Sequence, residues 1–150
     1  MLWVLLLGCR TTESLETFDT SQAGLVFRQG QAVWKQDATS PGLVLGFTIA
    51  THRDGRAQVQ VFKEIILLAT VQIGSEHWIV EDPLRRKRSV GEVVDGEVQE
   101  PPGRERWLQL TLGLSGRPVR PPWIRERQED GEILIRNADT GERIELFFDL

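Results

Sequence analysis

One stretch of sequence decides the fold: residues 43–63 read LVLGFTIATHRDGRAQVQVFK. In its first half every second residue is large and apolar, and a period of two is typical of a half-buried β-strand. Asp54-Gly55 follows, and a second alternating run comes after it. An Asp-Gly pair between two such runs is the strongest short-range signal for a β-hairpin. The sequence therefore predicts two paired strands, 43–51 and 56–63.

Further strand signals lie on both sides of this hairpin. Alternating apolar residues predict a strand over 67–73 and another around Trp78 and Val80. Asp82-Pro83 ends the second of these strands, because proline has no N–H for a central ladder. A C-terminal hairpin is predicted from 133–135 and 144–148.

Two segments give less regular signals. The apolar runs 25–27 and 32–34 flank Gln29-Gly30-Gln31, which predicts one interrupted or bulged strand. A short strand is predicted to begin near 88–90. Residues 91–106 are rich in Gly, Pro, Glu and Asp, so we expect a loop there.

The expected fold is mainly β, a β-rich α+β class: a curved antiparallel sheet or incomplete β-barrel with few helices. Helix is expected only over 12–22 and in part of 104–114. Residues 107–114, WLQLTLGL, leave two alternatives open. Their leucines mostly follow period two, which favours a strand, yet leucine is also a good helix former.

Composition argues against several classes of protein. The chain has 150 residues, enough for one domain, with 18 basic and 22 acidic side chains and a net charge of −4. Nucleic-acid binders are usually basic. One cysteine and two histidines leave few groups for a metal site or a catalytic triad, and common catalytic and nucleotide-binding motifs are absent. We therefore expect no enzyme, no cofactor, no metal and no nucleic-acid partner.

The N-terminus carries an apolar run from Leu2 to Leu7, followed by Gly8 and Cys9. The run is too short to span a bilayer, which needs about 20 residues. It resembles the lipobox of bacterial lipoproteins, in which the peptide is cut before a cysteine that is then lipidated. The resemblance implies a residual signal peptide over 1–8, a lipidated Cys9 with a polar tether over 9–22, and one β-rich domain over 23–150. The alternative is an N-terminal core strand that ends in a buried cysteine.

The residue after the cysteine indicates which of the two bacterial membranes would hold such a lipoprotein. It is Arg10, whereas aspartate there signals inner-membrane retention in enteric lipoproteins. The resemblance therefore implies the periplasmic face of the bacterial outer membrane.

One basic cluster stands out: Arg85-Arg86-Lys87-Arg88. Near an anionic membrane surface each such charge contributes about 1 kcal/mol, so the cluster could contact lipid headgroups or nucleic acid. The alternative is a solvated turn, balanced by Glu81, Asp82 and Glu92.

The order of the later segments is similar to that of the LolA/LolB family of periplasmic lipoprotein carriers and receptors. Residues 73–83, IGSEHWIVEDP, resemble a glycine turn followed by an aromatic-bearing strand, and 82–88 resemble the polar corner and basic strand that come next. Residues 107–114 resemble a leucine-rich helix, and 132–150 resemble the closing pair of strands. Together with the lipobox, this order matches the membrane-anchored, LolB-like branch.

The resemblance implies an incomplete barrel wrapped around helices, with an apolar cavity for acyl chains. The residues expected to line that cavity are Leu45, Phe47, Val59, Val61, Leu67, Val71, Trp78 and Val80, with Ala69 on the same face. The alternative for each of them is a dry packed core. Leu43, after Pro41-Gly42, is the nearest candidate for the exposed apolar loop residue by which such receptors engage cargo.

Two functions follow as expectations. The first is an outer-membrane-anchored periplasmic lipoprotein that binds acyl chains or lipidated proteins without catalysis. The second is an envelope lipoprotein that serves as a structural or assembly partner in a membrane complex. An open apolar cavity would favour the first function, and a filled one the second.

Overall fold

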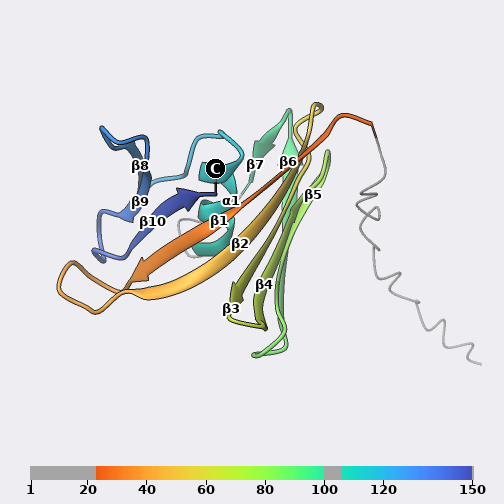
Figure 1. Ribbon diagram of the computed structural model, residues 1–150. Helices are drawn as coiled ribbons and strands as arrows, with labels where there is room; N and C mark the ends of the chain where they lie inside the picture. Colours follow the sequence, from red (N-terminus) through yellow and green to blue (C-terminus); the bar gives the residue numbers. More distant parts are fainter. Residues whose placement is uncertain (1–22, 100–105, 150) are drawn as a thin grey trace, which may run out of the picture.

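The computed structural model describes residues 23–99 and 106–149. These residues form one ten-stranded sheet, in which neighbouring strands run antiparallel, and one helix (Figure 1). The strands are β1 (Leu25–Lys35), β2 (Leu43–His52), β3 (Ala57–Lys63), β4 (Ile66–Ile73), β5 (His77–Asp82), β6 (Lys87–Val94), β7 (Glu97–Val98), β8 (Trp123–Arg127), β9 (Ile133–Asn137) and β10 (Arg143–Phe148). The helix is α1 (Arg106–Leu114).

The sheet has the order β7-β6-β5-β4-β3-β2-β1-β10-β9-β8. It bends around α1, and its edges β7 and β8 are not joined, so the barrel stays open (Figure 1). The predicted class, a mainly β curved sheet with few helices, is therefore confirmed. Within the described residues, no helix is long and apolar enough to cross a bilayer.

The predicted central hairpin is present as β2 and β3, whose register runs from Thr51 opposite Ala57 to Gly46 opposite Phe62. The hairpin turn is stabilised by the conformation and contacts of its own residues. Gly55 has φ +94°, and the Asp54 carboxylate accepts a hydrogen bond from the Arg56 amide at 3.0 Å. Glycine adopts a positive φ without steric strain, and the aspartate side chain readily accepts a hydrogen bond from the turn backbone. These two properties are why the pair predicts the hairpin.

The expected interruption near Gly30 is wrong. β1 is continuous from Leu25 to Lys35, and its pairing with β2 has no register shift. Gly30 is needed for space: a Cβ atom there would overlap the carbonyl oxygen of Phe147 and would lie 2.8 Å from the ring of Phe47. The glycine permits a close approach and does not break the strand.

Two further expectations are corrected beyond β5. Part of the loop predicted over 91–106 is strand, because β6 runs to Val94 and β7 pairs with it. The turn between them is Asp95-Gly96, with φ +52° and +77°, the conformation of a two-residue hairpin loop. Strand β8 also occupies part of the proline-rich stretch after α1, where no strand was predicted.

Residues 107–114 are helical. Gln109, Thr111 and Gly113 are buried along with the leucines at the even positions, so α1 is buried on nearly every side. In such a helix the period of the leucines does not indicate a face, which explains the strand-like pattern. The predicted anchor, Cys9, and the predicted helix over 12–22 lie outside the described residues.

Candidate functional site

Most of the residues predicted to line a cavity lie together on the concave face of the sheet. Seven of the eight belong to one hydrophobic cluster and are at most 3% exposed. They are Leu45, Phe47, Val59, Val61, Val71, Trp78 and Val80. Ala69 belongs to the same cluster. Alternation thus identified the inner face of four strands.

Leu67 is the exception. The pairing of β3 with β4 shifts between Val61 and Phe62, so Val61 pairs with Ala69 but Phe62 pairs with Leu67. Leu68 packs against the core, and Leu67 is only half-buried outside that cluster. A β-bulge inserts one residue and changes which side chains share a face.

The concave face is covered by α1. Leu108, Leu110, Leu112 and Leu114 are all in the same hydrophobic cluster as the strand residues, and none is more than 7% exposed. Gly113 lets α1 pack tightly against β9, because a Cβ atom there would overlap Cδ1 of Ile135. Side chains of the helix therefore occupy the space in which an acyl chain was expected.

Polar contacts hold both ends of α1. At its start, Nε of Arg106 lies 2.7 Å from Oε1 of Glu142, which also accepts a hydrogen bond from the indole of Trp34 at 2.8 Å. At its end, Arg125 donates to the Gly113 carbonyl at 3.2 Å.

Just beyond the helix, Arg117 donates to the carbonyls of Gly96 and Gly55, in two different hairpin turns. Desolvation by burial lowers the pKa of this arginine. These contacts fix the helix against the curved sheet at the end where the two turns lie.

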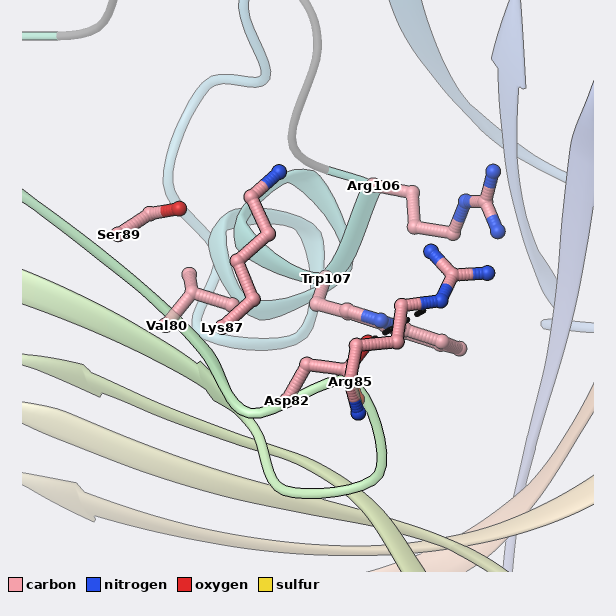
Figure 2. A pocket seen from close by; sticks show the side chains of 7 residues that line it. All are labelled: Val80, Asp82, Arg85, Lys87, Ser89, Arg106 and Trp107. Atoms are coloured by element: carbon pink, nitrogen blue, oxygen red, sulfur yellow. Dashed lines mark hydrogen bonds and ion pairs between the residues drawn. The ribbon is translucent and has the colours of Figure 1, made fainter.

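A polar pocket lies where α1 begins, beside the turn between β5 and β6 (Figure 2). Its volume is about 130 Å³, and its lining consists of Val80, Asp82, Arg85, Lys87, Ser89, Arg106 and Trp107. Three of these side chains are cations and one is a carboxylate. That carboxylate is already engaged, because Asp82 accepts a hydrogen bond from the Arg85 amide at 3.0 Å and lies 3.7 Å from its Nε.

The basic cluster of 85–88 is thereby divided between two faces of the sheet. Arg85 and Lys87 line the pocket. Arg88 lies 3.6 Å from Glu81, to which it is also paired in the ladder. Arg86 has φ +51° within the turn. Of the three predicted balancing carboxylates, Glu81 and Asp82 contact the cluster, whereas Glu92 lies opposite His77 toward the other end of the β5–β6 ladder. The remaining cations give the turn end an excess of positive charge.

The turns β3–β4 and β5–β6 lie next to each other at one end of the sheet (Figure 1). We call the residues Lys63 to Ile66 and Pro83 to Lys87 the hairpin end. Three apolar side chains are exposed there: Ile65 is 96% exposed, Leu84 63% and Ile66 49%. Sequence reasoning missed Ile65, because an isoleucine beside a strand looks like part of it.

Leu43, the earlier candidate for an exposed apolar loop residue, instead packs against the core. Within residues 23–99 and 106–149, no group of three or more His, Cys, Asp or Glu side chains is arranged to hold a metal ion. His52 contacts Asp54 at 2.9 Å in the β2–β3 turn.

No protein-family model matches this sequence, and no curated protein matches it either.

Proposed function

We propose that this chain is an outer-membrane-anchored periplasmic lipoprotein of LolB-like architecture, which handles lipid or lipidated proteins without catalysis. In this proposal the hairpin end meets the membrane surface. The observation that carries it is the exposure of Ile65 beside a basic turn. An isoleucine that is 96% exposed has no packing role in the folded chain, and Leu84 and Ile66 are exposed at the same end of the sheet. Groups of exposed apolar side chains rimmed by polar residues, unlike single ones, mark interaction sites.

The energetics suit reversible contact with an anionic bilayer. Moving one isoleucine side chain fully out of water contributes roughly 1.5–3 kcal/mol. Each basic side chain near an anionic surface adds about 1 kcal/mol. The hairpin end offers Lys63, Arg85, Arg86 and Lys87 against Glu64, with Asp82 directly before its second turn. The sum is a few kcal/mol, which is too weak for permanent attachment and sufficient for a tethered protein.

The proposed anchor is compatible with this orientation. Leu25 begins β1 at the end of the sheet opposite the hairpin end. The 11 residues of β1 span about 36 Å. Residues 10–22 could reach at most about 45 Å when fully extended. A lipid on Cys9 would therefore leave the hairpin end free to face the same membrane.

Fluorescent labelling tests the orientation directly. In the full chain with Cys9→Ser, the introduced cysteine of Ile65→Cys or Leu84→Cys is the only one and can carry an environment-sensitive dye. We expect a blue shift of its emission with vesicles of phosphatidylcholine mixed with phosphatidylglycerol, and the shift should shrink as salt is raised.

Val94→Cys is the matched control. Val94 is 49% exposed and lies at the other end of β6, so its dye should stay in water. Binding through the apolar N-terminal segment would bring the Leu25 end of the sheet to the membrane, and would therefore shift the dye at position 94 at least as much as the dye at position 65. Equal shifts at positions 65 and 94, or no shift at either, would contradict the proposal.

One observation favours the second expected function, an envelope lipoprotein that serves as a structural or assembly partner. The concave face is filled by the leucines of α1, and both ends of that helix are tied to the sheet. A filled concave face favours the assembly partner, because lipid handling is the function for which an open apolar cavity was expected. For lipid handling, an acyl chain would have to displace α1 from the concave face.

A further inference from the structure

We propose that the pocket at the start of α1 is a binding site for a phosphate group, either free or in the headgroup of a phospholipid. This inference goes beyond membrane contact by the hairpin end, because it concerns one defined pocket and a defined ligand chemistry. It does not require the membrane proposal to be correct.

The charge of the pocket is the first argument. Arg85, Lys87 and Arg106 bring three cations to a space of about 130 Å³. Asp82 lies 3.7 Å from Arg85, and Glu142, outside the lining, lies 2.7 Å from Arg106, so the group keeps an excess of positive charge. An anion in the pocket would be attracted by the positive charge that the two carboxylates leave unbalanced. Free phosphate carries up to two negative charges near neutral pH, and the phosphodiester of a phospholipid headgroup carries one.

The donors are the second argument. Figure 2 shows the side chains of Arg85 and Arg106 reaching toward the same region, with Lys87 beside the helix. The contact of Arg106 with Glu142 is made by Nε, and its two terminal nitrogens are the ones that suit a phosphate oxygen pair. Ser89 adds a hydroxyl and Trp107 an indole N–H.

The size of the pocket is the third argument. A single water needs only about 10–15 Å³ of such space, whereas pockets for drug-sized ligands begin near 300 Å³. The pocket lies between these limits, which suits a small anion or one headgroup. Val80 and Trp107 add apolar surface to the lining, against which the carbon atoms of a lipid could pack.

Two adjacent residues of β6 give a matched pair of variants. Lys87 lines the pocket, and no ion pair or hydrogen bond of its side chain is found among the described residues. Arg88, next along the strand, contacts Glu81 on the opposite face. Lys87→Gln and Arg88→Gln therefore remove the same charge from the same strand, and only the first removes it from the pocket.

The experiment is a titration of the ¹⁵N-labelled full chain with potassium phosphate at constant ionic strength. It follows the indole resonances, with Trp107→Phe identifying the signal of Trp107. We expect a saturable shift of that signal in the wild type and in Arg88→Gln. Lys87→Gln should weaken binding roughly tenfold, because a charge-assisted hydrogen bond is lost.

A second titration distinguishes the two sources of phosphate. It uses dihexanoylphosphatidylglycerol below the concentration at which micelles form. Tighter binding than inorganic phosphate assigns the pocket to headgroups, and equal or weaker binding assigns it to free phosphate.

A non-saturating response, or equal weakening in both variants, would overturn the site. Dye insertion at Ile65 can succeed or fail independently of this result, so the two proposals are tested separately.

Discussion

Replacing Gly30 with alanine is expected to lower the free energy of unfolding by about 3 kcal/mol or more. The new methyl group would overlap the backbone carbonyl of Phe147 and press on the ring of Phe47. A carbonyl in a ladder cannot move without opening the pairing of β1 with β10. That pairing joins the first seven strands to the last three, so the damage reaches the whole sheet.

Gly46→Ala is the control for this prediction. Gly46 lies on the neighbouring strand β2, and a Cβ atom there would meet nothing within 4 Å. Alanine at this position should be neutral or stabilise the protein by a few tenths of a kcal/mol. Urea unfolding of both variants measures the difference. Similar stability of the two variants would mean that β10 does not pass as close to β1 as described.

Replacing Leu110 with alanine is expected to cost about 2–5 kcal/mol of unfolding free energy. Leu110 is fully buried between α1 and the concave face. Truncating it removes favourable burial and leaves a cavity that the surrounding sheet cannot close. The measurement is again urea unfolding, with an unchanged dependence on denaturant as the sign that the same structure unfolds.

Leu84→Ala provides the comparison, since Leu84 is 63% exposed at the hairpin end. Its loss should change stability by no more than about 0.5 kcal/mol. A loss below about 1 kcal/mol for Leu110→Ala would mean that α1 rests loosely on the sheet. In that case the concave face would be far easier for an acyl chain to enter.

The sheet could be predicted where the local rules and the tertiary structure agree. Alternation and the Asp54-Gly55 turn specify β2 and β3, and the same reasoning finds β4, β5 and the C-terminal hairpin. This reasoning failed at Gly30. A glycine is needed there because the backbone of Phe147 passes too close to leave room for a Cβ atom. That partner is remote in sequence, so no local pattern shows it.

The candidate site was predictable only in part. The inner face follows from period two, but the bulge after Val61 exchanges Leu67 for Leu68, and alternation alone cannot place a bulge. Gln109 and Thr111 of α1 are buried as well as the leucines. The sequence therefore does not show which side of the helix faces the sheet. The phosphate pocket joins Lys87 of β6 to Arg106 of α1, and only the folded chain brings these residues together.

Native mass spectrometry tests the central claim, lipid handling, most directly. The full chain carrying Cys9→Ser cannot be acylated there, so any lipid it carries is bound without a covalent link. Purified without detergent, it is predicted to show a lipid-sized adduct that mild organic extraction removes. A mass of the protein alone, from a sample that unfolds cooperatively, would contradict lipid handling and leave the envelope assembly partner as the function to pursue.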